Sequence, residues 1–109
     1  MIAVSDATFT DLVLNSPCPV LVYFWAPWCG LCRFVGPLLS QLQENWGGGL
    51  QLVAINADAN LRLASTYQLT SLPTLILFQS GQVLYRLDQF QTREDLHRIS
   101  QQINPAQFL

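Results

Sequence analysis

Apolar residues follow two patterns along this chain, unbroken runs and runs with a helical period. A continuous run of apolar, β-branched and aromatic residues occupies residues 20–25, and two further mostly apolar segments are expected as strands, residues 50–56 and 74–78. Such runs are typical of strands buried on both faces, as in a sheet covered by helices. A fourth strand is expected at residues 82–87, because the Ser80-Gly81 pair before it fits a hairpin turn. Residues 2–4 are a candidate for a short edge strand.

The longest helical pattern covers residues 32–46, and the three glycines after it end the helix. Pro37 lies inside this segment. We expect it to kink the helix, because proline removes one backbone donor and clashes with the preceding turn.

Three shorter helices complete the pattern. One runs to about Asn15 after Ser5 or Asp6 as its cap, and one covers residues 61–67. The last covers residues 92–103, with Thr92 as N-cap and Asp95 at the third helical position, close to a capping box. The resulting order, βαβαββα, predicts an α/β fold with a mixed central β-sheet and helices on both faces.

Length and composition narrow the class of protein. The 109 residues predict a single domain, 1–109, and 50% hydrophobic residues are enough for one core without disulfide bridges. All five basic residues are arginine and the net charge is −2, so we expect no nucleic-acid partner and no anionic membrane surface. No apolar run approaches the ~20 residues of a membrane span.

Three cysteines are too few, and odd in number, for the disulfide framework of a small secreted domain. The N-terminal residues carry no basic segment and no long apolar run, so they do not fit a signal peptide. We therefore expect a cytoplasmic protein, and in a reducing compartment a Cys-x-x-Cys pair is catalytic or metal-binding more often than structural.

Candidate chemistry lies in Cys29-Gly30-Leu31-Cys32, at the turn from a strand into a helix. Free backbone N–H groups and the helix dipole at that position favour the thiolate form of Cys29. As a thiolate, Cys29 attacks a substrate disulfide, and Cys32, one turn further in and more buried, resolves the mixed disulfide. Gly30 allows the tight turn.

A lone Cys-x-x-Cys is also half of a zinc site. The remaining ligand candidates are Cys18 and His97. Cys18 precedes a strand of about seven residues, which places it ~20 Å from Cys29 at ~3.3 Å per residue, and His97 is isolated on the last helix. We therefore expect no metal, an inert and partly buried Cys18, and a surface His97.

The segment Val22 to Cys32, with the sequence VYFWAPWCGLC, resembles the active-site segment of thioredoxins. Leu72-Pro73-Thr74, 41 residues after Cys32, resembles the cis-proline loop of that family. Asn56-Ala57-Asp58, the Phe78 and Ser80-Gly81 positions and Pro37 also match, so the resemblance covers nearly the whole chain. It implies the thioredoxin fold.

The resemblance also implies roles for the loop before the third long strand. Pro73 is expected to be cis and to face the cysteine pair, where it keeps metal ions off the thiolates. The Leu72 backbone then pairs with an extended substrate segment. The expected docking surface consists of Trp28, Gly30, Leu31, Leu72 and Thr74, flanked by Pro27. The alternative is that Pro73 only starts a strand.

The chain departs from the thioredoxin pattern in three features. Leu31 stands where proline restricts the dithiol loop, and we expect a more oxidising potential. Tyr23 stands where the family has a buried aspartate that takes the Cys32 proton, and Ala54 where a lysine couples to that aspartate. The buried ion pair is therefore absent, so the proton leaves through water or resolution is slow. Asp88-Gln89-Phe90 replaces a small glycine-containing segment, which would place Phe90 on the docking face.

The resemblance implies a redox-active dithiol that reduces protein disulfides and is itself reduced by a thioredoxin reductase. This role is one of electron transfer in cell redox homeostasis, carried out by a monomer with no cofactor beyond the Cys29–Cys32 disulfide. Two alternatives stay open. One is a more oxidising isomerase or oxidant, and the other is a docking module with little turnover that uses Trp28, Leu31 and Phe90.

Overall fold

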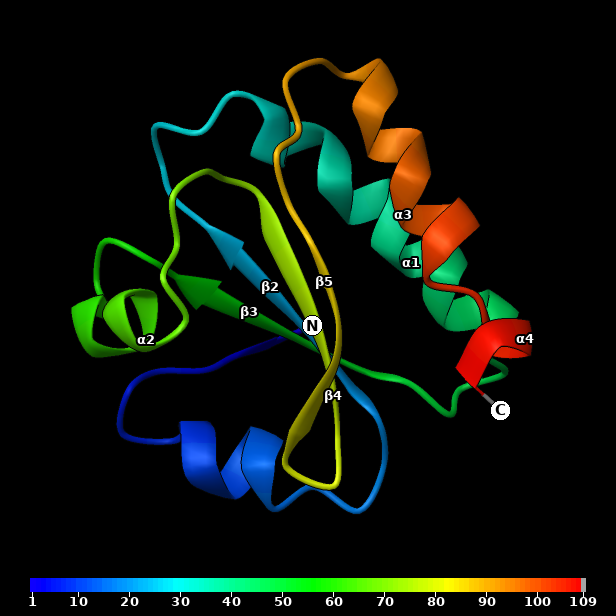
Figure 1. Cartoon of the computed structure of the whole chain (residues 1–109), viewed down its shortest axis with the longest axis horizontal. Coiled ribbons are helices and arrows are strands. Elements are labelled where there is room, and N and C mark those ends of the chain that lie inside the picture. The colour runs from blue at the N-terminus through cyan, green and yellow to red at the C-terminus, as the bar shows by residue number, and fades with distance from the viewer. Residues whose placement is uncertain (109) are drawn as a thin grey trace.

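The structure is a computed structural model that describes residues 1–108. Within these residues the chain forms a five-stranded sheet with strand order β1-β3-β2-β4-β5 (Figure 1). Strands β1, β3 and β2 are parallel, β4 is antiparallel to β2, and β5 is antiparallel to β4. The strands are β1 (Ile2–Ala3), β2 (Val20–Trp25), β3 (Gln51–Asn56), β4 (Thr74–Gln79) and β5 (Gln82–Leu87).

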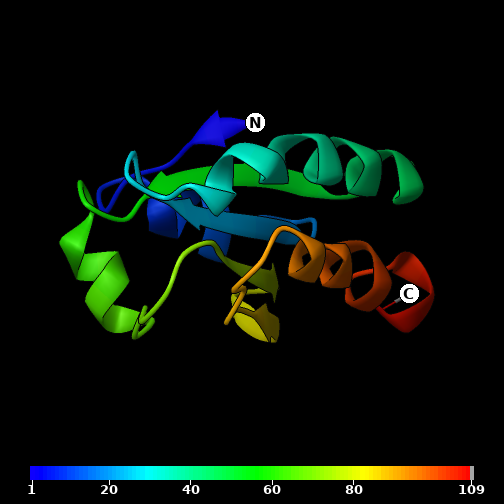
Figure 2. The same ribbon diagram turned by 90° about the horizontal axis from the view of Figure 1, so that it is seen from above.

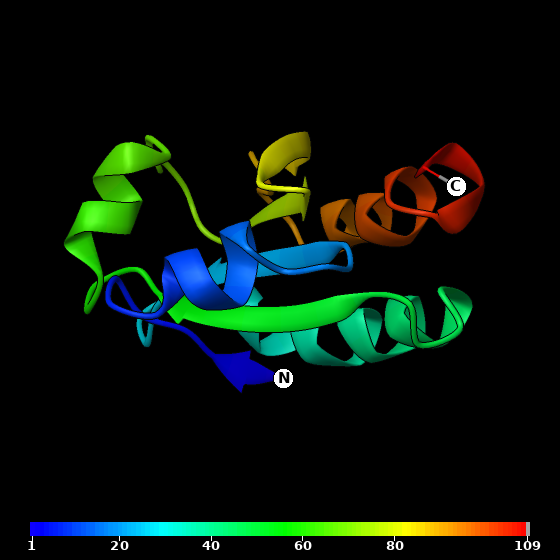
Figure 3. The same ribbon diagram turned by 90° about the horizontal axis from the view of Figure 1, so that it is seen from below.

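Helices cover both faces of this sheet, so the expected α/β fold with a mixed central sheet is confirmed. Figure 2 views the molecule from the side of α1 and α3, and Figure 3 from the side of the first helix, η1. The helices are η1 (Thr10–Leu14), η2 (Leu31–Phe34), α1 (Val35–Asn45), α2 (Leu61–Thr66), η3 (Glu94–His97), α3 (Arg98–Gln102) and α4 (Pro105–Phe108).

Strand β2 lies in the middle of the sheet and divides its side chains between two apolar clusters. Leu21 and Tyr23 face the cluster under α1 and α3. Val20, Val22 and Phe24 face the cluster under η1 and α2. Because successive side chains of a strand point to opposite faces, an unbroken apolar run is what a doubly covered central strand requires.

The predicted strands agree with the structure to within one residue at each end, but the long helix does not begin as expected. It is divided into the 3₁₀-helical turn η2 and the α-helix α1, which meet at Phe34 and Val35. Pro37 is the third residue of α1. In the first turn of an α-helix the missing N–H has no intrahelical partner to lose, so Pro37 lies where proline is well tolerated.

The predicted cap of the first helix is wrong. Helix η1 begins only at Thr10 and has no side-chain cap. The Asp6 carboxylate accepts a hydrogen bond from the Leu63 N–H at 3.0 Å, and the Asp6 N–H donates to Asn60 Oδ1 at 2.8 Å. Asp6 thus caps α2, which lies far away in sequence and beside it in space.

The predicted capping box between Thr92 and Asp95 is present at the start of η3. The Thr92 N–H donates to Asp95 Oδ2 at 2.9 Å, and the Asp95 N–H donates to Thr92 Oγ1 at 3.3 Å. A second N–H, from Gln91, reaches the same carboxylate at 2.8 Å. These bonds satisfy backbone donors that the helix start leaves without intrahelical partners.

This box makes stability depend on pH. The backbone N–H groups of Gln91 and Thr92 hold the pKa of Asp95 below its ordinary value of 3.8. The contribution of the carboxylate is therefore present above that value and is lost as pH falls through the folded-state pKa. We expect Asp95→Asn to lower the urea midpoint at pH 7 and to make no difference once Asp95 is protonated.

Glu94→Gln is the matched control, since it neutralises an exposed acid one residue earlier in the same turn. Equal midpoints for Asp95→Asn and the unaltered protein at pH 7 would contradict the role given to the box.

Candidate active site

The two cysteines of the predicted site form a disulfide where β2 passes into η2. The Cα atoms of Cys29 and Cys32 are 5.4 Å apart. The loop that carries Cys29 lies at the same end of the sheet as the loop before β4, at the top of Figure 1. Register confirms this placement, because Phe24 at the end of β2 pairs with Thr74 at the start of β4.

Two backbone hydrogen bonds fix the first cysteine. The Cys29 N–H donates to the Ala26 carbonyl at 3.1 Å, and the Cys32 N–H donates to Cys29 Sγ at 3.2 Å. A backbone donor directed at this sulfur favours its negative charge once the disulfide is reduced. The turn geometry therefore suits Cys29 as the attacking sulfur.

The expected order of burial is reversed. Cys29 is only 7% exposed, whereas Cys32 is half-buried. A hollow of about 200 Å³ opens beside the disulfide, and both cysteines line it. Its other lining residues are Tyr23, Trp25, Ala26, Pro27 and Arg33.

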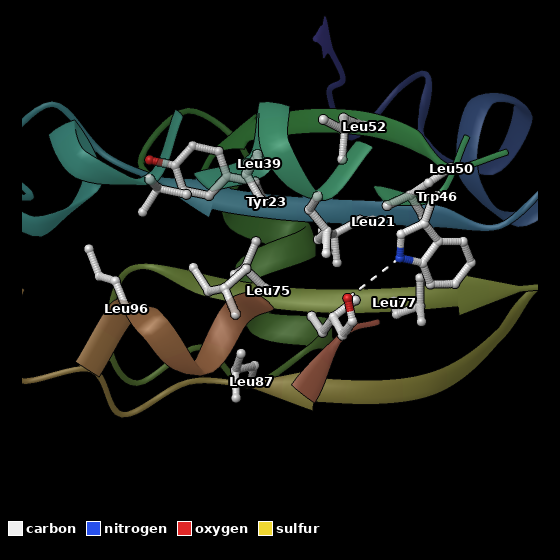
Figure 4. Packing of buried hydrophobic residues seen from close by; sticks show 14 of the residues in the cluster. Leu21, Tyr23, Leu39, Trp46, Leu50, Leu52, Leu75, Leu77, Leu87 and Leu96 are labelled. Atoms are coloured by element: carbon white, nitrogen blue, oxygen red, sulfur yellow. Dashed lines mark hydrogen bonds between the residues drawn. The ribbon is translucent and has the colours of Figure 1, made fainter. Parts of the chain in front are cut away.

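Tyr23 occupies the wall behind the second cysteine. Its ring belongs to the cluster under α1, and Figure 4 shows its oxygen at the outer end of the ring, turned away from Leu21. The hydroxyl donates a hydrogen bond to the Cys32 carbonyl at 3.1 Å. Burial raises the pKa of Tyr23 to about 12. Ala54 lies directly opposite Tyr23 on β3, so the two departures from the family pattern are cross-strand neighbours.

The peptide bond between Leu72 and Pro73 is cis, as expected. Pro73 is buried and Leu72 is half-buried. Thr74 is fully buried, and its hydroxyl donates to the Ser71 carbonyl at 2.7 Å. Its side chain is therefore removed from the docking surface and holds the loop from within, because a short polar side chain next to a turn bonds to its own backbone.

Trp28 and Leu72 line a second hollow, of about 210 Å³, on the other side of the disulfide. Trp28 is 68% exposed, and its indole N–H donates to Asp58 Oδ2 at 2.8 Å. Gly30 is exposed and Leu31 is half-buried, packed against the cluster under α1. The structure thus brings Trp28 and Leu72 together, while Leu31 turns partly toward the core.

The expectation that Phe90 lies on the docking face is wrong. Phe90 is 5% exposed, belongs to the cluster under α1 and α3, and lies beneath the Arg98 guanidinium, 4.5 Å from its ring centroid. A large apolar ring gains more from burial in this cluster than from exposure. Gln89 before it takes the left-handed conformation that favours glycine, with φ of 62°.

Arg86 is a residue that sequence reasoning missed. From β5 it forms an ion pair with Asp88 at 3.0 Å and donates to the carbonyls of Tyr67 and Gln68. These carbonyls begin the loop that leads to Leu72, so Arg86 ties this loop to the sheet. The only available signal was an arginine within a strand two residues before an acid.

The remaining candidate ligands lie apart from the disulfide. Cys18 is a free thiol, half-buried, with its sulfur 3.5 Å from Ser16 Oγ. His97 is exposed on η3. Over residues 1–108, no group of three or more His, Cys, Asp or Glu side chains is placed to hold a metal ion. In the same residues no helix combines the length and apolarity needed to span a bilayer.

Comparison with known proteins agrees with the geometry. The family profile described as Thioredoxin matches residues 1–104. The chain belongs to the thioredoxin family. It is 47% identical to Thioredoxin 1 of Nostoc sp. over 79 residues, and these residues cover 72% of this chain and 74% of that protein. Thioredoxin of Synechocystis sp. is 48% identical over the same shares of each chain.

A third thioredoxin, Thioredoxin 1 of Synechococcus elongatus, is 48% identical over 80 residues, 73% of this chain and 75% of the relative. Together with the Cys29–Cys32 disulfide, this membership makes the chain a thiol–disulfide oxidoreductase of the disulfide-reductase kind. Neither alternative, the docking module or the more oxidising isomerase or oxidant, has better support.

Proposed function

We propose that this protein reduces disulfides in other proteins and is returned to its dithiol form by a thioredoxin reductase in the cytoplasm. It acts as a monomeric single domain, residues 1–109, and needs no cofactor beyond its own disulfide. The observation that supports this proposal most directly is the Cys29–Cys32 disulfide. It follows β2, at the same end of the sheet as the cis Leu72–Pro73 bond.

The reaction has two exchange steps. In the first, the Cys29 thiolate bonds to one sulfur of the substrate disulfide, and the other substrate sulfur leaves as a thiolate and is protonated by solvent. In the second, Cys32 bonds to Cys29 and releases the first substrate sulfur. The substrate gains two electrons, and the protein ends as the disulfide seen in the structure.

Docking in this proposal uses the backbone before Pro73 and the hollow beside Trp28. An extended substrate segment pairs with the free backbone of Leu72, as in strand addition to a sheet edge. Its neighbouring apolar side chain enters the hollow between Trp28 and α2, which Leu61 and Leu69 also line. The hydrogen bond that the Trp28 indole N–H donates to Asp58 fixes the ring that forms one wall.

The redox midpoint tests both the function and the effect of Leu31. Fluorescence of Trp25 and Trp28 is titrated against graded dithiol–disulfide buffers. We expect one transition between the ~−270 mV of thioredoxin and the ~−180 mV of protein disulfide isomerase. Leu31→Pro should move it about 30 mV toward the thioredoxin value, or ~1.4 kcal/mol, because proline restricts the reduced loop.

Gly36→Ala is the matched control, because a Cβ added at Gly36 meets only open space in the same region. A second proline variant such as Leu38→Pro is not suitable, since it would break α1. A midpoint near −180 mV that Leu31→Pro leaves in place would favour the isomerase or oxidant role. No transition at all would leave only the docking module.

A further inference from the structure

The resolving step lacks the buried acid that the family pattern provides, and the structure shows what stands in its place. The Tyr23 hydroxyl donates to the Cys32 carbonyl at 3.1 Å, and the Val35 N–H donates to the same oxygen. One backbone atom of the second cysteine is therefore held from β2 and from the start of α1. No carboxylate lies among the residues that line the hollow beside Cys32.

The charged and titratable groups around Cys32 are few. The hollow presents the two cysteines, the Tyr23 phenol and the Arg33 guanidinium. From the neighbouring elements, Asp58 faces the opposite side and bonds to Trp28, and Arg93 of the loop before η3 lies over the Phe34 ring at 4.4 Å. With its pKa raised to about 12, the Tyr23 phenol stays protonated and takes no proton from a thiol at neutral pH.

The hollow offers a different route for the proton. Its volume of about 200 Å³ exceeds the ~30 Å³ that one water molecule occupies in the liquid, and it is open to solvent. Cys32 is half-buried at its edge, more exposed than the attacking Cys29. The thiol is thus within reach of bulk water without any internal relay.

We propose that Tyr23 is a neutral positioning residue in the resolving step, whose hydroxyl fixes the Cys32 turn while the Cys32 proton passes directly to solvent in the adjoining hollow. This inference rests on the proposed function and adds to it how the Cys32 thiol loses its proton before it attacks the mixed disulfide.

The step is balanced by water alone. Cys32 loses its thiol proton to water, and the thiolate electron pair forms the bond to Cys29 Sγ. The bond between Cys29 and the substrate sulfur breaks, and its electron pair leaves on the substrate sulfur. That sulfur takes a proton from solvent. The Tyr23 hydroxyl keeps its proton and its hydrogen bond to the Cys32 carbonyl throughout.

Stopped-flow reaction of the reduced protein with excess 5,5′-dithiobis(2-nitrobenzoate) separates the two steps, in a Cys18→Ser background so that the free Cys18 thiol releases no further thiolate. Attack by Cys29 releases one coloured thiolate in a phase whose rate grows with reagent concentration. Resolution by Cys32 releases the second in a phase independent of that concentration, and Cys32→Ser removes this second phase.

We expect the second-phase rate to rise about tenfold per pH unit between about pH 5.5 and 7.5, because only the thiolate fraction reacts. Tyr23→Phe keeps the ring and removes the hydroxyl. It should slow the second phase by up to about tenfold at every pH, with the same slope and an unchanged first phase. Tyr85→Phe is the matched control, since its hydroxyl bonds to Gln102, away from the disulfide.

Two outcomes would overturn the inference. A second phase whose rate does not change with pH would mean that an internal group takes the Cys32 proton. This outcome is measured on the unaltered protein and does not depend on whether a variant folds. Equal second phases in Tyr23→Phe and the unaltered protein would mean that the hydroxyl does not position Cys32. Failure of the proposed function looks different, since the unaltered protein would then release no second thiolate.

Discussion

Cys29→Ser is expected to abolish protein-disulfide reduction, with a loss of at least about 10³-fold in turnover. A serine hydroxyl does not exchange with a disulfide, and no other group in the site replaces the missing thiolate. Cys32 does not substitute, because the backbone donor that favours a thiolate, its own N–H, is directed at position 29 and not at its own sulfur. Turnover is measured as NADPH oxidation coupled through a thioredoxin reductase, with insulin as the protein disulfide.

Cys18→Ser is the matched control. It makes the same chemical change in a half-buried thiol that lies before β2, at the end of the strand away from the disulfide. We expect full activity from it, and native circular dichroism from both variants. Activity that survives Cys29→Ser, or that disappears in Cys18→Ser, would place the chemistry elsewhere.

The strands and the mixed sheet could be predicted because their signals are local or follow from general rules. The run from Val20 to Trp25 is apolar throughout, and such a run is stable only in a strand covered on both faces. The cysteine turn was equally accessible, since the Cys-x-x-Cys lies at a strand-to-helix junction and the other candidate zinc ligands, Cys18 and His97, are placed away from it.

Contacts between distant segments could not be predicted in this way. Asp6 has the sequence signature of a cap for the helix that follows it, yet it caps α2, 57 residues further on. Phe90 was expected on the docking face because its segment replaces the small one that the thioredoxin pattern has there, yet it packs in the cluster with Leu96 and Ile99. Local sequence preference describes the structure that an isolated segment favours, whereas the positions of these side chains depend on tertiary contacts that only the complete fold provides.

The site shows the same division between local and distant information. The identity of Tyr23 excludes a carboxylate at that position, but the sequence does not say where the hydroxyl donates. That contact requires the fold to bring the Tyr23 hydroxyl of β2 within 3.1 Å of the Cys32 carbonyl of η2, nine residues further along the chain. The hollow beside the disulfide is likewise a product of the fold, because Tyr23 of β2 and Pro27 of the following turn line it together.

The largest effect on stability is expected from Phe24→Ala. Phe24 is fully buried in the cluster under η1 and α2, and its ring centroid lies 6.4 Å from that of Tyr67. Truncating a buried phenylalanine costs about 3–5 kcal/mol, since the lost transfer free energy is joined by the cost of a cavity. Against a total of about 5–15 kcal/mol for a typical domain, this leaves the protein marginal, and urea unfolding of the oxidised form measures it.

Val83→Ala is the matched control, because Val83 is 50% exposed on β5 and its truncation should cost less than about 0.5 kcal/mol. A loss below about 1 kcal/mol for Phe24→Ala would contradict the packing described here. The Phe24 ring and the Cys32 side chain belong to clusters on opposite faces of the sheet. The redox midpoint of the folded fraction should therefore stay in place, since removing the ring weakens the sheet beneath the site without touching the turn that holds both sulfurs.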